Sequence, residues 1–430
     1  MNSAILDCIN TISKSLTDTL DLNNDVEKYS KLRSILILFY FPAVLHPPCF
    51  KTILSPLLLQ IEKLSKQATH ILIHWLSNLP RLFMQIIGAV HFAISMYFCT
   101  RKFPNIHSEE IKQYLKIISV LYDANSFLEN PFPPSVFYNH HINEEIDYEH
   151  ELDLNRNHLP SVLRFPYVLS IKTKAAICHL ESEQYMGIYA YRSLLLNVFG
   201  NQNSDLFLTL RIRRDHLIDD AVTQLSIQNS CNFLKKLRVI FEGESAVDVG
   251  GPSREFLYLV SEQLFSPDHG MFITVNENKY HWFSQYTFEE DRSFFLVGAV
   301  VGLAIHSSVV LPIRFPQVVY KRIMRPNQPL TINDLKEVDP QLAKSLLSIS
   351  NMAKNGEDVS CLMLNFTAQI DCFGEQVSVP LVEGMQDVDV VNENVDFYIS
   401  SYINFLLVKN IENHFEAFRR GFELACRLPS

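Results

Sequence analysis

The chain has 430 residues, of which 47% are hydrophobic and 20% are charged, as is ordinary for a globular protein with a sizeable core. Its 37 basic and 47 acidic residues give a formal net charge of −10, which argues against nucleic-acid or anionic-membrane binding, because both depend on clustered lysine and arginine. Glycine is scarce, at 13 residues, which excludes a glycine-punctuated β-propeller, and the length allows two or three domains.

Residues 1–103 are predicted to be helical and strongly apolar. Two stretches in this region suggest membrane spans. The first, 35–45, is too short to cross a bilayer and is interrupted by proline. The second, 82–99, is longer but contains Gln85 and His91, and we interpret it as a buried helix, because a span needs about 20 mainly apolar residues. The start of the chain lacks a basic segment followed by a long apolar core, so no secretory signal is predicted.

Residues 108–121 have the pattern of an amphipathic helix. The first of them is a serine, a candidate N-cap, and two glutamates follow in the first turn, where they favour the helix dipole. Ile111, Leu115 and Ile118 share one helical face. The proline-rich run 130–134 cannot continue a helix and predicts a bend.

Histidines and acids gather in residues 137–156, which suggests a metal site. Neither H-E-x-x-H nor H-x-x-E-H occurs there, because Glu145 stands where the second histidine of the inverted motif would be. We therefore favour a solvated acidic loop and predict no metal ligand and no cofactor-binding residue. The clustered residues are His140, His141, Glu144, Glu145, Asp147, Glu149, His150, Glu151 and Asp153.

Residues 160–201 contain a helical stretch that ends at a Gly-Asn pair. The polar run 201–205 that follows is the predicted domain boundary, which divides the chain into 1–204 and 205–430. Residues 206–227, which follow this boundary, carry clustered charges of both signs. Their mixed charges indicate a salt-bridged helix start rather than a nucleic-acid site; the residues are Arg211, Arg213, Arg214, Asp215, Asp219 and Asp220.

The stretch 237–256 reads LRVIFEGESAVDVGGPSREF and predicts a strand, a turn and a helix. The turn contains Asp248, Gly250 and Gly251, and Pro252 suits the start of the helix. This arrangement can cradle a phosphate. However, no lysine follows the glycines as the Walker pattern requires, and G-x-G-x-x-G and G-x-S-x-G are also absent. A plain turn is therefore preferred, with both glycines in backbone conformations that a Cβ disfavours.

Residues 294–311 are almost wholly apolar and contain Gly298-x-x-x-Gly302, the spacing of a transmembrane helix-packing face. From composition alone, a membrane span and a buried helix both remain open. Thr331 and Asp334 form a capping-box pattern at the start of a further helix.

Strand and helix signals fill the rest of the chain. A turn at 276–278 lies between two predicted paired strands, and LNFTAQI and EQVSVPL predict another pair. Residues 396–426 are predicted to be helical, with these aromatic and apolar side chains facing inward: Phe397, Tyr402, Phe405, Leu406, Phe415, Phe418 and Phe422.

Six sequence blocks, in one order and with matching spacing, resemble the N-lobe of HECT-type ubiquitin ligases, above all those of the HERC group. They are FEGESAVDVGGPSREFLYLVSEQLF, YHWFS, FFLVGAVVGLAIHSSVVLPIRFP, VVYKRI, LNFTAQIDCFGE and FEAFRRGFELAC. The resemblance implies a mainly α (α+β) fold, with a helical pre-HECT region followed by the large, mostly helical N-lobe subdomain with short strands. Residues 206–227 resemble the opening of the same domain, which implies a strand followed by a helix there. The resemblance also implies that 294–311 is a helix buried in that lobe, whose small residues let neighbouring helices approach.

The resemblance further implies ubiquitin transfer to substrate lysines through a cysteine thioester, with protein substrates and ubiquitin-pathway proteins as partners. That chemistry needs an accessible thiolate, which in the family lies in a C-lobe motif of the Thr-Cys-x-Asn type. No such motif occurs here. Cys426 matches a family position that is followed by Gly-Gly and the subdomain that docks the conjugating enzyme. We therefore expect the docking subdomain and the catalytic C-lobe to be missing, and docking to be lost.

The eight cysteines form no C-x-x-C pair, so zinc is not predicted, and their scatter favours reduced thiols in the cytoplasm. Each is expected to be a buried, unreactive thiol, so no catalytic residue is predicted. They are Cys8, Cys49, Cys99, Cys178, Cys231, Cys361, Cys372 and Cys426. Two functions remain open: a truncated HECT ligase that is inactive alone, or a non-catalytic scaffold that competes for the partners of a full-length ligase. Neither needs a cofactor, nucleic acid or a membrane span.

Overall fold

The computed structural model describes residues 32–34, 36–40, 53–62, 64–128, 130–199, 204–244, 250–275, 277–372 and 375–426. Cys8, Cys49, Asp248, the turn residue Asn276 and most of the predicted boundary, 201–203, lie outside them. The chain forms two compact units, unit 1 (Met1–Glu181) and unit 2 (Ser182–Ser430). The division falls within the long helix α9 (Ile171–Phe199), ahead of the polar run at which the sequence predicts a boundary.

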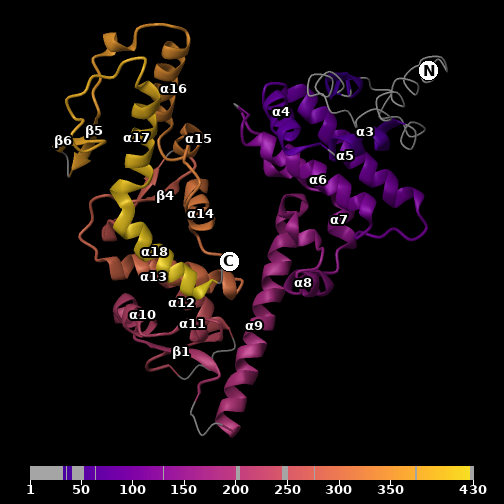
Figure 1. Ribbon diagram of the computed structural model, residues 1–430. Helices are drawn as coiled ribbons and strands as arrows, with labels where there is room; N and C mark the ends of the chain where they lie inside the picture. The colour runs from indigo at the N-terminus through magenta and orange to yellow at the C-terminus, as the bar shows by residue number, and fades with distance from the viewer. Residues whose placement is uncertain are drawn as a thin grey trace. The chain divides into compact units, whose positions relative to one another are not determined.

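All regular elements in the described part of unit 1 are helices (Figure 1). Its helices α3 to α6 pack on one another around a single apolar core. The shorter helices α7 and α8 follow the proline-rich run 130–134, which forms no α-helix, as predicted, although α6 already ends at Asn125. The helices are α3 (Ser55–Glu62), α4 (Lys66–Ser77), α5 (Pro80–Thr100), α6 (Glu109–Asn125), α7 (His140–Glu145) and α8 (Tyr148–Arg156).

Helix α5 contains the longer of the two apolar stretches in the first hundred residues. Among the described helices, α5 is the one long and apolar enough to cross a membrane by length and composition. Ten of its side chains are nevertheless buried in the core of unit 1. His91, one of the two polar residues in the stretch, lies between the carbonyl of Val136 and the amide of Asn139, at 3.0 Å from each. The helix therefore has the environment expected of a core helix.

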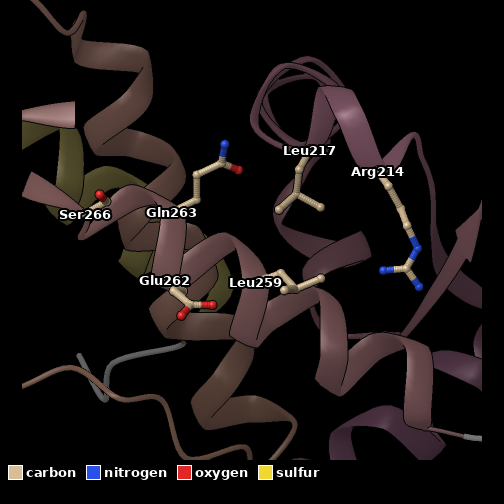
Figure 2. Close-up of a pocket in the computed structure, with 6 residues that line it drawn as sticks. All are labelled: Arg214, Leu217, Leu259, Glu262, Gln263 and Ser266. Atoms are coloured by element: carbon tan, nitrogen blue, oxygen red, sulfur yellow. The ribbon is translucent and has the colours of Figure 1, made fainter. Parts of the chain in front are cut away.

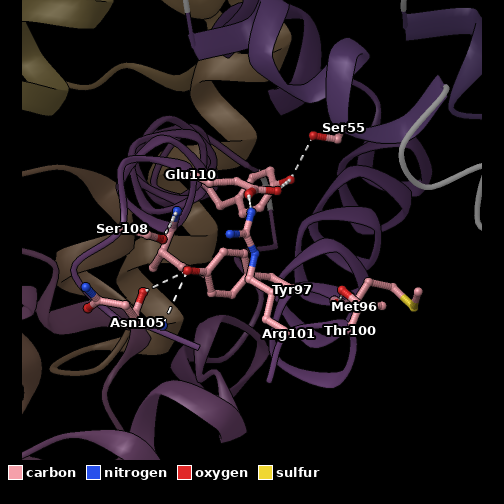
Figure 3. A network of polar contacts seen from close by, with 10 residues as sticks. Ser55, Met96, Tyr97, Thr100, Arg101, Asn105, Ser108 and Glu110 are labelled. Carbon is pink, nitrogen blue, oxygen red and sulfur yellow. Dashed lines mark hydrogen bonds and ion pairs between the residues drawn. The ribbon is translucent and has the colours of Figure 1, made fainter. Parts of the chain in front are cut away.

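Polar contacts join α3, α6 and the C-terminal end of α5 (Figure 3). The guanidinium of Arg101 lies 4.4 Å from the ring centroid of Tyr97, and its Nη2 donates to Glu110 at 2.6 Å. The hydroxyl of Tyr114 donates to Ser55 at 3.0 Å, and burial raises its pKa well above the usual range. Ser108 caps α6 by accepting from the backbone N–H of Ile111, as predicted.

The sequence predicts a solvated acidic loop over residues 137–156; most of the acidic side chains there are exposed, but the prediction of a loop is wrong. The segment forms α7 and α8, because Asn139 and Asp147 each accept from backbone N–H groups of the first turn that follows. Glu151 is only 1% exposed. Its carboxylate accepts from the Ser161 hydroxyl at 2.6 Å and the Val162 N–H at 2.9 Å, and it lies 3.1 Å from a ring nitrogen of His107. The cluster thus contains a buried structural carboxylate.

Unit 2 begins with the predicted strand and helix. Strand β1 (Phe207–Ile212) pairs in parallel with β2 (Lys236–Phe241), and α10 (Leu217–Ser226) connects them together with α11 (Ser230–Phe233). Alternate residues of β2 are buried, which confirms its predicted pattern. Arg213 forms an ion pair with Asp220 at 2.7 Å, as expected for a salt-bridged helix start.

In the turn before α12 (Gly251–Leu264), the predicted glycine conformation is confirmed at Gly250 but not at Gly251. Gly250 has φ +106°, a left-handed conformation that favours glycine. Gly251 is the first residue of the helix, has no positive φ and has open space where a Cβ would lie. The expectation of strain at Gly251 is therefore wrong, because the change of direction is completed one residue earlier. Pro252 follows within the first turn, as predicted.

The run 294–311 lies mostly in α13 (Asp291–His306), a buried helix that packs closely along α18 (Glu412–Ala425). A Cβ at Gly298 would overlap the carbonyl oxygen of Phe418, and one at Gly421 would overlap that of Phe295. Glycines on both helices thus allow backbone-to-backbone contact, which confirms the buried-helix expectation.

The remaining elements agree with the predicted pattern in most respects. Hairpins β3–β4 and β5–β6 form as expected, and Thr331 and Asp334 make the predicted capping box. Phe397 is 50% exposed, so its predicted inward orientation is wrong. These elements are β3 (Phe272–Val275), β4 (Tyr280–Phe283), α14 (Gln317–Met324), α15 (Ile332–Leu335), α16 (Pro340–Lys354), β5 (Thr367–Cys372), β6 (Glu375–Pro380) and α17 (Val395–Leu407).

Candidate functional site

The cysteines are the first candidates for a transferase site, and the expectation that they are buried is wrong. Four of the five whose thiols the structure describes are exposed: Cys99, Cys178, Cys231 and Cys361. Cys426 is half-buried. The sequence could not show this, because the exposure of a helical cysteine depends on which face of the helix its neighbours cover.

Exposure alone does not make a thiol reactive, because the nucleophile is the thiolate. Desolvation, and to a smaller extent Glu181, raises the pKa of Cys178 above its usual range. The Sγ of Cys361 donates to the carbonyl oxygen of Asp358 at 3.0 Å, and no histidine or other base contacts it among the described residues. Neither cysteine therefore has the surroundings of an activated nucleophile.

A candidate binding site lies between α10 and α12 (Figure 2). It is a hollow of about 390 Å³. The apolar side chains of Leu217 and Leu259 line it, and Glu262, Gln263 and Ser266 add polar groups. In Figure 2, Arg214 lies at the end of the hollow away from Ser266. A hollow with these residues can accept a side chain of a protein partner, and its lining supplies no thiol.

Arg214 connects the elements that surround this hollow. Its Nη1 donates to Glu255 of α12 at 2.8 Å, and its Nε donates to Glu244 just beyond β2. Its guanidinium also lies 4.1 Å from the ring centroid of Phe241. Hydrogen bonding to Arg214 lowers the pKa of Glu244 below its usual range. From the sequence, nearby aspartates are the expected ion-pair partners of Arg214. Its partners in the structure are instead two glutamates, 30 and 41 residues further along the chain.

A second, more polar hollow of about 360 Å³ shares Leu217 and Gln263 with the first. Acidic and histidine side chains line it, among them Asp219, His269 and Glu289. The His269 ring lies 3.4 Å from Glu289, whose other oxygen accepts from Ser293 at 2.8 Å. Within the described residues, no group of three or more His, Cys, Asp or Glu side chains is placed to hold a metal ion. We call the two hollows together the α10–α12 face.

Comparison with known proteins assigns part of unit 2 to a family. The HECT-domain (ubiquitin-transferase) family matches residues 258–430, all within unit 2. These residues are thus HECT-domain sequence, and the predicted resemblance to HECT-type ubiquitin ligases is confirmed.

Individual relatives extend the similarity over most of the chain. It is 32% identical to the human "Probable E3 ubiquitin-protein ligase HECTD2" over 92% of its own length and 54% of that protein's. It is 28% identical to the human "Probable E3 ubiquitin-protein ligase HERC3", over 92% of this chain and 39% of the relative. For "Probable E3 ubiquitin-protein ligase mug30" of Schizosaccharomyces pombe, identity is 30% over 74% of this chain and 39% of the relative. The chain therefore spans about half the length, or less, of the curated relatives it matches.

Proposed function

We propose that this chain acts in ubiquitin transfer to protein lysines and supplies a non-catalytic part of a HECT-type ligase. The observation that carries the proposal is the HECT-domain match over residues 258–430, within a single compact unit. The reaction proceeds by attack of a ligase thiolate on the thioester of a conjugating enzyme, followed by attack of a lysine amine on the new thioester. In this proposal, the 430 residues bind pathway proteins and do not carry ubiquitin themselves.

Two observations support the non-catalytic role. The 430 residues contain no Thr-Cys dipeptide. Burial raises the pKa of the Cys178 thiol, which disfavours its thiolate, and the Cys361 thiol donates to the carbonyl oxygen of Asp358 rather than to a base. By contrast, the α10–α12 face offers hollows of about 390 and 360 Å³ that can hold side chains of another protein. A cytoplasmic location belongs to this proposal, because eight scattered cysteines without a C-x-x-C pair fit reduced thiols better than a disulfide framework.

A thioester-loading assay tests the proposal directly. The chain is incubated with activating enzyme, a panel of conjugating enzymes and ubiquitin, and a full-length HECT ligase serves as positive control. We expect no thiol-sensitive ubiquitin adduct on a non-reducing gel. An adduct that disappears in Cys426→Ala or Cys361→Ala would identify a working nucleophile and refute the non-catalytic role.

The second candidate function is a scaffold that competes for the partners of a full-length ligase. The exposed α10–α12 face, which carries hollows but no thiol in its described lining, favours this candidate. Adding excess chain to a reaction driven by a full-length relative should then reduce the rate of substrate ubiquitination. A parallel pull-down with each conjugating enzyme tests our prediction that docking is lost. Retention of any one of these enzymes on the chain would contradict that prediction.

A further inference from the structure

A third hollow in unit 2, of about 740 Å³, lies among α14, α17 and α18. Part of its edge is the loop 326–330 between α14 and α15. Phe397 and Leu330 give it apolar surface, and Ser400 and Asn404 add a hydroxyl and an amide. These residues belong to one compact unit, so the hollow is defined within it.

A buried arginine lines this hollow. Arg322 of α14 is only 8% exposed. Its Nη1 donates to the carbonyl oxygen of Leu407 at 2.8 Å, and its guanidinium carbon lies 3.6 Å from the ring centroid of Phe415. A guanidinium has five N–H donors, and this backbone bond uses one of them.

Arg322 forms no ion pair within 4.0 Å with any carboxylate of the described residues. A buried charge is costly unless it is paired. Desolvation accordingly lowers the pKa of Arg322 to about 10, although Glu412 and Glu416 act in the opposite direction. The folded protein thus keeps a buried cation at the wall of an open hollow, with donors to spare for an anion.

The other charged groups of the hollow limit what that anion can be. Glu412, Glu416 and Arg419 line it together with Arg322, and the formal charges of the four groups cancel. Glu416 is already engaged, because Arg419 donates to it at 2.8 Å. Because the lining carries no net positive charge, its attraction and repulsion of an anion largely cancel, whereas the cost of taking an ion out of water rises steeply with the charge of that ion. The hollow therefore suits a singly charged carboxylate better than a phosphate.

We propose that this hollow binds a carboxylate carried beside an apolar group. Arg322 holds the carboxylate through the planar, two-point geometry that a guanidinium offers. Phe397 and Leu330 contact the apolar part of the ligand. Such a carboxylate can come from an acidic side chain of a protein partner or from a small carboxylic acid, and the chemistry of recognition is the same for both.

Calorimetric titration of the whole chain with benzoate tests the proposal, with benzamide as the neutral ligand of the same shape. Benzoate should bind and benzamide should not. Arg322→Met should weaken benzoate binding roughly 10- to 100-fold, because a charge-assisted hydrogen bond is lost. Arg325→Met removes an exposed arginine just beyond the same helix and should leave binding unchanged.

Two further variants keep the test informative if Arg322→Met fails to fold. Ser400 is exposed on α17, so Ser400→Phe should fill the hollow and abolish benzoate binding without changing the melting temperature. Glu412→Gln removes a negative charge beside the site and should strengthen binding roughly two- to tenfold. No benzoate binding to the wild type, or equal binding by wild type and Ser400→Phe, would overturn the proposal.

A second ligand distinguishes a carboxylate on a protein partner from one on a small acid. A blocked peptide with one glutamate flanked by leucines is compared with the same peptide containing glutamine. If the glutamate peptide binds more than tenfold more tightly than benzoate, a protein partner is the source. If only benzoate binds, the source is a small acid. Both results require that Ser400→Phe abolishes the binding, and binding that survives this substitution counts against the site.

Discussion

The substitution Gly298→Ala should strongly destabilise unit 2, because α13 and α18 touch through their backbones. The added methyl carbon would overlap the carbonyl oxygen of Phe418. It would also lie 2.8 Å from the backbone nitrogen of Phe422, where ordinary contacts are 3.4–4 Å. The helices would have to separate by at least 0.6 Å to relieve that second contact alone. Overpacking of a core typically costs 1–3 kcal/mol, and here both obstacles are backbone atoms, so we expect about 3 kcal/mol or more.

For a unit of this size, a loss of about 3 kcal/mol lowers the melting temperature by roughly 6–12 °C. Differential scanning calorimetry of the purified chain measures this shift. Gly187→Ala is the matched control, because Gly187 lies in helix α9 with nothing within 4 Å of its added Cβ. This control should stabilise the protein by about 0.5–1 kcal/mol through helix propensity. If the two variants melt at the same temperature, the close approach of α13 and α18 is refuted.

Other substitutions test separate features. Glu151→Ala should destabilise unit 1 by about 1–3 kcal/mol, because it leaves a buried backbone N–H without its acceptor; an unchanged urea midpoint would contradict this role. Gly250→Ala should cost about 1–2 kcal/mol because of its positive φ, whereas Gly251→Ala should be nearly neutral; equal chemical-denaturation curves would show that the turn is misassigned. Burial lowers the pKa of His91 below 6.5, so its neutral form stabilises the fold above pH 6.5 and this contribution is lost as pH falls. The loss of melting temperature between about pH 7 and pH 5 should therefore be smaller in His91→Gln, and an identical pH profile would rule out this titration. Finally, a carbonate wash should leave the protein in the supernatant, and recovery in the washed membrane pellet would instead favour α5 as a span.

Features with a local signal could be predicted from the sequence. The alternation in 237–241, the capping box of Thr331 and Asp334 and the glycine spacing at 298–302 each specify a structure over a few residues. The glycines also illustrate a limit, because their spacing suits a membrane helix and a buried helix equally well. The family resemblance resolved that choice, and the close packing of α18 on α13 agrees with it.

Features that depend on distant partners could not be predicted. Glu151 appears in the sequence as one acid among several, and its burial depends on Ser161 and Val162, which are 10 and 11 residues away. Nothing marks Arg322 as a buried cation, because its acceptor on Leu407 is 85 residues away. The nearest local signal is its helical spacing from the buried residues Val318 and Val319, which places it on an apolar face.

The contact between α13 and α18 can form only late in the synthesis of the chain on the ribosome. Helix α13 ends at His306 and α18 begins at Glu412, so about a hundred residues must be translated between them. At roughly 5–20 residues per second, the nascent chain waits about 5–20 s before the partner helix emerges. During that interval, the glycine face of α13 and its buried apolar residues have no α18 to cover them. Chaperones that bind apolar nascent segments should therefore associate with this chain late in its translation and leave once α18 has been made.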